Sequence, residues 1–127
     1  MSGLLGLSAN NRHNAGMKYF FVYILASKRN GTLYTGSTDD IAKRVWEHKN
    51  KVIKGFTAKY GVHRLVWCET HETREAAFRR ERQIKEWRRA WKLRLIEEMN
   101  PDWNDLYETL NQWWRLNPSP RSSRRAR

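Results

Sequence analysis

Cysteine, long apolar runs and acidic residues are all scarce in this sequence, and each scarcity narrows what the protein can be. Cysteine occurs once, as Cys68, so no disulfide can form within the chain, and the composition fits a reducing compartment such as the cytoplasm. The longest apolar run, residues 19–26, is far too short to cross a bilayer, which argues against an integral membrane protein. The N-terminal segment has neither a basic region nor a long apolar stretch, so we expect no signal peptide.

The shortage of acidic residues leaves the chain strongly basic. Lys and Arg number 25 against 13 Asp and Glu, which gives a formal net charge of +12, and the sequence pI is near 10.4. Proteins with such a charge usually bind polyanions, and nucleic acid is the commonest of these. A solvated basic surface and binding to acidic lipid are the alternatives. Charge alone does not separate a nucleic-acid binder from an enzyme.

The chain has the size of one domain. At 127 residues it can build a modest core, and its 39% hydrophobic content argues against global disorder. We interpret residues 1–16 as a disordered leader and residues 17–111 as the folded domain. Residues 112–127 contain five arginines, two prolines and no acid, which is typical of a disordered basic tail.

Hydrophobic patterning predicts three strands and several helices. Residues 18–28 are nearly continuous apolar sequence and predict a strand covered on both faces. Asn30-Gly31 predicts a tight turn with positive φ, from which a second strand returns to Gly36. Further along the chain, a helix is predicted at 40–51, a basic loop with two glycines at 51–61 and a strand at 63–70. A second helix begins after its cap, Thr73. A third helix at 90–99 is ended by Asn100-Pro101, and a short amphipathic segment follows at 102–110. The expected fold class is α/β (α+β), with a three-stranded, mostly antiparallel sheet flanked by helices.

Tryptophan is unusually common, and most of it is expected inside. We assign five tryptophans to the core and to helix packing: Trp46, Trp67, Trp87, Trp91 and Trp103. Trp113 and Trp114 lie near the tail and are less easily buried. They are candidates for stacking on bases, for packing on the domain or for a dimer contact.

The first predicted helix carries polar groups beside its apolar face. Ile41, Val45 and Val52 mark the inward face. Arg44 and His48 are four residues apart, so they project together from the margin of that face.

The helix after Thr73 places a carboxylate among apolar side chains. Its inward stripe consists of Ala77, Phe78, Glu81 and Ile84. A buried carboxylate is unfavourable by several kcal/mol unless it is paired or binds a metal, so we expect a compensating group at Glu81.

Each polar residue, taken singly, has an ordinary structural interpretation. Arg44 can be a surface cation, His48 a satisfied interface histidine and Glu81 the partner of an arginine, while Tyr23 and Tyr34 can be core aromatics. Together at one face of the sheet they match the needs of phosphodiester hydrolysis. That reaction uses a carboxylate for a divalent ion, an arginine for the phosphoryl charge and a group that takes a proton from water. A tyrosine ordinarily loses its proton at about pH 10, so this role requires nearby cations or a metal.

The sequence resembles a GIY-YIG nuclease domain at these residues. The two half-motifs correspond to "FVY" at residues 21–23 and "YTG" at residues 34–36. "DIAKRVWEH" resembles the family's helix with an arginine and, four residues on, a tyrosine or histidine. The segment beginning "REAAFRRERQ" resembles the helix that bears the metal-binding glutamate. The resemblance spans about Met17 to Leu106 and is especially close to small stand-alone bacterial members.

What the resemblance implies is metal-dependent hydrolysis of DNA phosphodiester bonds, in DNA repair or processing. One Mg²⁺ or Mn²⁺ would be bound by Glu81. Tyr34 would activate the attacking water, with help from Tyr23 and His48. Arg44 would hold the scissile phosphate.

The sequence departs from the family pattern at several positions. Phe21 replaces the glycine of the first half-motif, and Thr35 replaces the isoleucine of the second. Ser37 stands where the repair-incision branch has a lysine, and the stretch near Leu93 offers no counterpart of that branch's asparagine. Gly36 is kept, which would leave room beside Tyr34.

We expect cleavage that is structure-selective or non-specific, because no DNA-specificity domain is recognised in the sequence. Salt-sensitive phosphate contacts are expected from the basic loop, the helix after Thr73 and the arginine-rich tail. The residues assigned to nucleic-acid binding are Lys43, Lys49, Lys51, Lys54, Lys59, Arg80 and Lys85.

A zinc site is a weaker interpretation of the same sequence. Cys68 and His71 have the spacing of half such a site, but a structural site needs four clustered ligands. Only His48 and His63 remain nearby in sequence, so the pattern does not favour zinc.

Two functions from different classes therefore stay open. One is a metal-dependent DNA endonuclease, and the other is a catalytically inactive module that binds DNA or RNA. They differ at Glu81, because only the nuclease requires a carboxylate that binds a metal.

Overall fold

The structure is a computed structural model that describes residues 18–110. The leader and tail expected at residues 1–16 and 112–127 lie outside the described residues. The elements in chain order are β1 (Phe20–Ala26), β2 (Leu33–Thr38), α1 (Ile41–Lys49), α2 (Phe56–Tyr60), β3 (Arg64–His71), α3 (Arg74–Glu86) and α4 (Arg89–Met99).

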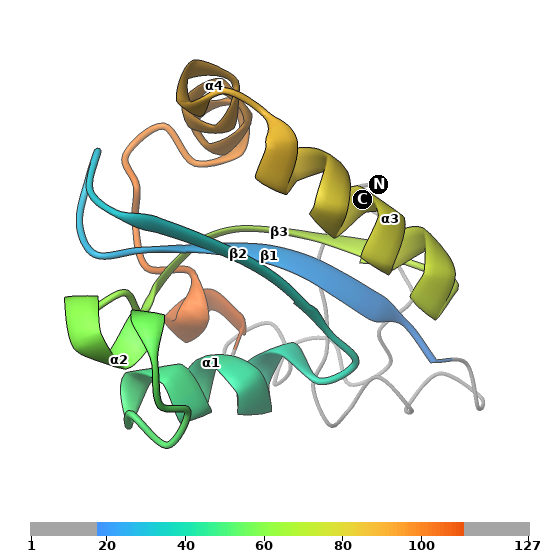
Figure 1. Ribbon diagram of the computed structural model, residues 1–127, viewed down its shortest axis with the longest axis horizontal. Coiled ribbons are helices and arrows are strands. Elements are labelled where there is room, and N and C mark those ends of the chain that lie inside the picture. Colours follow the sequence, from blue (N-terminus) through green and yellow to red (C-terminus); the bar gives the residue numbers. More distant parts are fainter. Residues whose placement is uncertain (1–17, 111–127) are drawn as a thin grey trace.

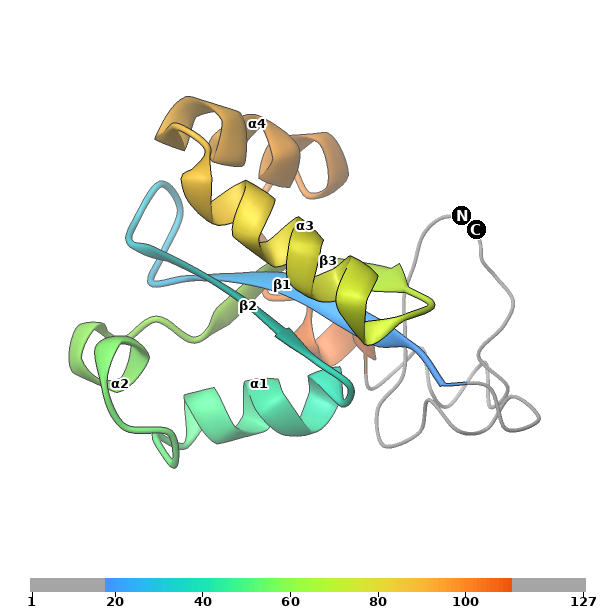
Figure 2. The same ribbon diagram turned by 45° about the vertical axis from the view of Figure 1, so that its right-hand side comes forward.

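A three-stranded sheet forms the middle layer of the molecule. Its strand order is β2-β1-β3, and β1 pairs antiparallel with both neighbours. Helices α1 and α2 lie on one face of the sheet, and α3 and α4 lie on the other (Figures 1 and 2). The expected α+β class, with an antiparallel sheet flanked by helices, is confirmed.

The central strand β1 supports a core on each face. Alternate residues Phe21, Tyr23 and Leu25 pack in the cluster that includes residues of α1. The residues between them pack with residues of α3 and α4 in a second cluster that contains Trp67 and Trp103. Side chains alternate along a strand, so a continuous apolar run is what a strand covered on both sides requires. The interpretation of this run as a strand buried on both faces is confirmed.

The hairpin between β1 and β2 has a longer turn than the sequence predicts. Asn30 has φ 58°, but Gly31 is not among the residues with positive φ. The Gly31 N–H donates to the Lys28 carbonyl at 2.9 Å, and the Ser27 N–H donates to the Thr32 carbonyl at 3.0 Å. The expected positive φ is therefore present at Asn30, but the expectation of a tight turn at Asn30-Gly31 is wrong. The second strand also continues beyond Gly36, as far as Thr38.

Side-chain caps begin two of the helices. Asp40 accepts a hydrogen bond from the Lys43 N–H at the start of α1, and Thr73 accepts one from the Ala76 N–H at the start of α3. Such caps satisfy amides that have no partner within the helix. The short helix α2 was not expected, because its sequence between Gly55 and Gly61 is typical of a loop.

Several side chains expected inside are exposed. On the α1 side, Val52 is 56% exposed and Trp46 is 50% exposed; on the other side, Phe78 is 50% exposed and Trp91 is 45% exposed. The inward stripe of α3 is narrower than predicted and consists of Ala77, Glu81 and Ile84. Helix neighbours are turned by about 100° from each other, so Phe78 points away when Ala77 faces the sheet.

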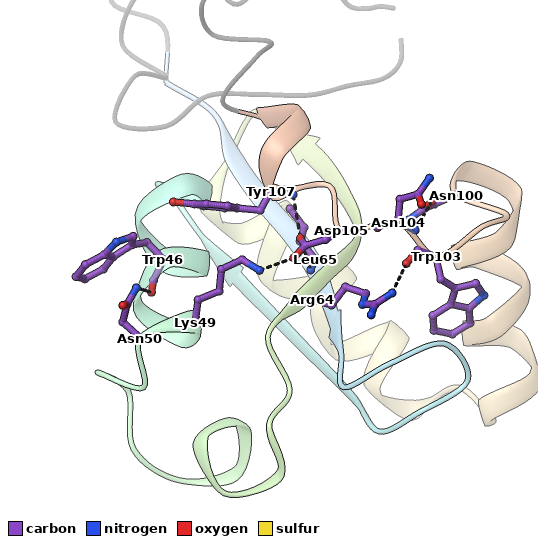
Figure 3. Close-up of polar contacts among 10 residues, drawn as sticks. All are labelled: Trp46, Lys49, Asn50, Arg64, Leu65, Asn100, Trp103, Asn104, Asp105 and Tyr107. Carbon is purple, nitrogen blue, oxygen red and sulfur yellow. Dashed lines mark hydrogen bonds and ion pairs between the residues drawn. The ribbon is translucent and has the colours of Figure 1, made fainter.

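The segment after α4 returns to the sheet and to α1. Asp105 accepts hydrogen bonds from the Leu65 and Tyr107 amides and forms an ion pair with Lys49 (Figure 3). Asn100 anchors the same segment by donating to the carbonyls of Val66 and Asn104. These contacts cover the outer edge of β3.

Among residues 18–110, no helix combines the length and the apolar character that a membrane span requires.

Candidate active site

Three aromatic rings gather on the face of the sheet that α1 covers. Tyr23 and Tyr34 lie on neighbouring strands with ring centroids 6.4 Å apart. The His48 ring, on the last turn of α1, is 6.1 Å from Tyr23 and 5.4 Å from Tyr34. Tyr34 is partly exposed, whereas Tyr23 and His48 are buried. Tyr34 is therefore the member of this cluster that solvent can reach.

Two hydrogen bonds fix the His48 ring. Its Nε2 lies 3.2 Å from the Tyr23 hydroxyl, and its Nδ1 lies 2.9 Å from the Thr57 hydroxyl on α2. Burial lowers the pKa of His48, and the positive charge of Arg44 lowers it further. A neutral imidazole has one donor and one acceptor nitrogen, so it can complete both hydrogen bonds. His48 therefore ties β1, α1 and α2 together.

Tyr23 is held as a neutral phenol. Burial raises the pKa of its hydroxyl, the neighbouring Tyr34 and Glu81 raise it further, and Arg44 opposes the change. Because Tyr23 keeps its proton, its hydroxyl can donate to Nε2 of His48, which leaves Nδ1 to donate to Thr57. This arrangement makes Tyr23 a positioning group for the histidine ring.

Arg44 lies one helical turn before His48 on α1. Its Nε is 3.5 Å from Glu47 Oε1, and its side chain is 42% exposed. The guanidinium therefore faces solvent while it still affects the pKa values of Tyr23 and His48. A cation with this exposure can receive an anionic ligand from solvent.

Glu81 lies on the opposite face of the sheet from the three rings. It projects from α3, with 8% of the residue exposed. Ser37 Oγ donates to its Oε1 at 2.6 Å, and Lys85 Nζ is 2.6 Å from its Oε2. The expected compensation of this buried carboxylate is thus supplied by a serine and a lysine.

The expectation that all five polar residues meet at one face of the sheet is wrong. Ser37 is an odd number of residues from Tyr34, so the two side chains point to opposite faces of β2. Tyr34 packs against the core beneath α1, and Ser37 contacts α3. The candidate site therefore wraps around β2, which is an edge strand of the sheet.

Gly36 is packed tightly against the aromatic cluster. It is paired with Tyr23 in the β1–β2 register. A Cβ atom added at Gly36 would lie 2.6 Å from the Tyr23 Oη and 2.7 Å from its Cζ. The glycine is thus required for the Tyr23 hydroxyl to reach His48 across β2.

We expect Gly36→Ala to destabilise the protein by about 1–3 kcal/mol, the usual effect of overpacking a filled site. Tyr23 is 1% exposed and packed in the core cluster, so the added methyl should displace its hydroxyl and break the bond to His48. Thermal unfolding measures the loss of stability, and the histidine ring resonances in NMR report the bond. An unchanged melting temperature with an unchanged His48 resonance would contradict this packing.

The basic residues expected to bind nucleic acid fall into two groups. Lys43, Lys51, Lys54 and Lys59 are exposed on the α1 and α2 side of the molecule. The remaining three form ion pairs: Lys49 with Asp105, Arg80 with Glu69, and Lys85 with Glu81.

Arg80 has a structural environment. Its Nε is 3.0 Å from Glu69 Oε2, and its guanidinium lies 5.4 Å from the centroid of the Trp87 ring. Through its ion pair with Glu69, Arg80 fastens α3 to β3. Lys49 similarly links α1 to the segment after α4 (Figure 3).

Sequence reasoning missed two members of the site. Ser37 appeared only as a departure from the family pattern, although it donates directly to Glu81. Thr57 was placed in a loop, although it is buried and contacts His48. Neither contact could be predicted from the periodicity of a single helix or strand, because the two partners of each contact lie on separate elements.

Cys68 and His71 take part in separate interactions. Cys68 is 6% exposed, and burial, with a smaller effect of Glu69, raises the pKa of its thiol to about 12. His71 Nε2 lies 2.7 Å from Glu69 Oε2. The two side chains thus belong to the core and to the Glu69 ion pairs.

Comparisons with known proteins agree on one family. The GIY-YIG catalytic domain matches residues 19–94. A UPF0213 protein of Staphylococcus saprophyticus is 41% identical over 86 residues, which cover 65% of this chain and 99% of the relative. One from Staphylococcus aureus is 42% identical over 87 residues, with coverage of 65% and 99%.

A solved structure also resembles the chain. It is the solution NMR structure of a UPF0213 protein from Bacillus halodurans, with 29% sequence identity and a TM-score of 0.44. The match covers 68% of this chain and 92% of that chain. Since the catalytic-domain match spans more than half of the chain and the staphylococcal relatives are covered almost completely, the chain belongs to the GIY-YIG nuclease family.

Proposed function

We propose that this protein is an endonuclease that hydrolyses DNA phosphodiester bonds with one bound Mg²⁺ or Mn²⁺. We further propose that it selects DNA by structure or cleaves without selection, and that it acts in DNA repair or processing in the cytoplasm. The observation that carries the proposal is Glu81, a nearly buried carboxylate on α3 that contacts Ser37 of the edge strand β2, the strand that also carries Tyr34.

The donor set at Glu81 suits a hard divalent ion. Among the described residues no group of three or more His, Cys, Asp or Glu side chains could enclose a metal. Magnesium commonly keeps several waters and binds through one or two carboxylates, so a single glutamate is sufficient. When bound, the ion would polarise the phosphate and neutralise its charge. Lys85 now occupies one Glu81 oxygen, but its side chain is 48% exposed and can turn into solvent.

The protein's own residues divide the remaining work. Arg44 is partly exposed and would hold the phosphate, where its guanidinium can donate two parallel hydrogen bonds. Tyr34 would take the proton of the attacking water, since it is the member of the aromatic cluster that is partly exposed. Tyr23 and His48 would support it by fixing the geometry of the cluster.

Ser37 would orient the metal-binding carboxylate. Its hydroxyl donates to Oε1 of Glu81 at 2.6 Å, which leaves Oε2 facing the more exposed Lys85. Groups that hydrogen-bond a metal ligand fix its direction and raise the metal affinity.

The four exposed lysines would contact the DNA backbone. Lys43 lies on α1, Lys59 lies on α2, and Lys51 and Lys54 lie between them; all four are exposed. These two helices cover the face of the sheet that carries Tyr34 (Figure 1). Contacts of this kind carry no sequence information and weaken steeply as salt rises.

Metal-dependent cleavage by the purified full chain tests the proposal. We expect supercoiled plasmid and branched DNA to be cut with Mg²⁺ or Mn²⁺ and left intact with EDTA. RNA substrates assayed in parallel determine which nucleic acid is hydrolysed. Salt-sensitive binding to DNA without cleavage of any substrate would overturn the nuclease proposal and favour an inactive nucleic-acid-binding module.

A further inference from the structure

Two aromatic rings project from α2 into solvent. Phe56 is 48% exposed and Tyr60 is 51% exposed, and their ring centroids are 4.9 Å apart. They are one helical turn apart, so they lie on the same side of this short helix. Neither ring belongs to either core cluster. Exposure of two adjacent aromatic rings is unfavourable in water and often marks a binding surface.

Lysines lie close to this pair in the sequence, and acidic residues are absent from the same stretch. The sequence contains no Asp or Glu between Glu47 and Glu69. Three exposed lysines flank the rings, and Lys59 Nζ lies 5.3 Å from the centroid of Tyr60. In the described part of the chain, none of these three lysines forms an ion pair with a carboxylate. We define the α2 surface as Lys51, Lys54, Phe56, Lys59 and Tyr60.

The inner side of α2 is attached to the candidate active site. Thr57 is 4% exposed and contacts Nδ1 of His48 at 2.9 Å, and its carbonyl accepts a hydrogen bond from the Val62 amide. Gly55 and Gly61 bound the helix, with φ angles of 114° and 66° that favour glycine. One buried threonine therefore holds the α2 surface beside the aromatic cluster of the site.

The composition of the α2 surface selects the chemistry of its partner. A partner for this surface needs negative charges that pair with the lysines and flat apolar groups that stack on the aromatic rings. It must carry both kinds of group at close spacing. A nucleic-acid strand has both features in every nucleotide, and bases stack on aromatic side chains whatever their identity. Bases inside a duplex are already stacked on each other, so the ring that binds here belongs to an unpaired nucleotide.

We propose that the α2 surface binds an unpaired DNA nucleotide next to the phosphate held at the active site. This inference rests on the proposed nuclease function and gives it a substrate class, namely DNA in which a single strand meets a duplex. Phe56 and Tyr60 would stack on the base, and the lysines would contact the adjoining phosphates. The fully paired duplex offers only its backbone to this surface and binds more weakly.

DNA binding in EDTA tests this proposal without requiring cleavage. The probe is a duplex with one single-stranded arm that carries 2-aminopurine, whose fluorescence is quenched when the base stacks. We expect the full chain to quench the fluorescence and to prefer this probe to a paired duplex of equal length. The double variant Phe56→Ala/Tyr60→Ala should lose about 5- to 150-fold in affinity for the arm, the range of one stacked base, with little change for the duplex.

Phe78→Ala on α3 is the matched control, because Phe78 is 50% exposed and lies on the other face of the sheet. It should change neither the quenching nor the preference. Equal binding of both probes by the unaltered protein, or an equal loss in the Phe78 variant, would overturn the α2 proposal. Absence of cleavage with any metal would instead overturn the nuclease proposal, and the stacking measured in EDTA would stand.

Discussion

Replacing Glu81 by glutamine should lower metal-dependent DNA cleavage by at least about 100-fold, which is a usual loss when one electrostatic group of a catalytic site is removed. The amide oxygen still accepts the hydrogen bond from Ser37, so the side chain keeps its place. The negative charge that would hold the divalent ion is lost. Cleavage of plasmid DNA at a fixed Mg²⁺ or Mn²⁺ concentration measures the rate, and DNA binding in EDTA should be retained.

Glu86→Gln provides the control for this substitution. Glu86 ends the same helix and is exposed, so the change in net charge is identical while the site is untouched. It should cleave at the rate of the unaltered protein. Residual cleavage by the Glu81 variant at the rate of the control would rule out Glu81 as the metal ligand and would point to a contaminating nuclease.

Trp103→Ala should be the most destabilising of the simple core substitutions, at about 3–5 kcal/mol. Trp103 is fully buried beneath α4, and its Nε1 donates to Glu97 Oε2 at 2.8 Å. Its own carbonyl accepts a hydrogen bond from Arg64 (Figure 3). Truncation leaves a large cavity and removes the partner of Glu97. For a domain of this size the melting temperature should fall by about 12 °C or more.

Trp46→Ala removes the same side chain from an exposed position. Trp46 is 50% exposed on α1 (Figure 3), and its carbonyl contact with Asn50 does not depend on its side chain. We expect a change within about 0.5 kcal/mol, as for other surface substitutions. Comparable losses from the two variants, measured by urea unfolding, would show that the assigned core is incorrect.

The elements that could be predicted are those with a strong local signal. The run that became β1 is apolar on both sides of the strand, and a strand with two covered faces needs that composition. Asp40 and Thr73 predict helix starts because their side-chain oxygens satisfy amides only three residues away. The need for a partner at Glu81 also follows from its place among apolar neighbours.

The arrangement of the site could not be predicted, because it depends on long-range packing. Periodicity places Glu81 on the inward face of its helix, but it does not tell which face of the sheet that helix covers. The contact of Ser37 with Glu81 joins residues 44 positions apart. The same limit explains Trp46, whose size suggests burial although the residue is half exposed.

The position of β2 in the sheet has a consequence for inhibition. The segment after α4 covers the outer edge of β3, and the Leu106 amide donates to the Leu65 carbonyl there. Among residues 18–110, β2 has a strand partner on one side only, β1. Tyr34 lies on one face of β2, and Ser37, which contacts Glu81, lies on the other. Extended peptides add to such edges through main-chain hydrogen bonds. A peptide added along β2 would cover both halves of the candidate site at once, so we expect a fourth strand there to block the proposed cleavage without filling a pocket.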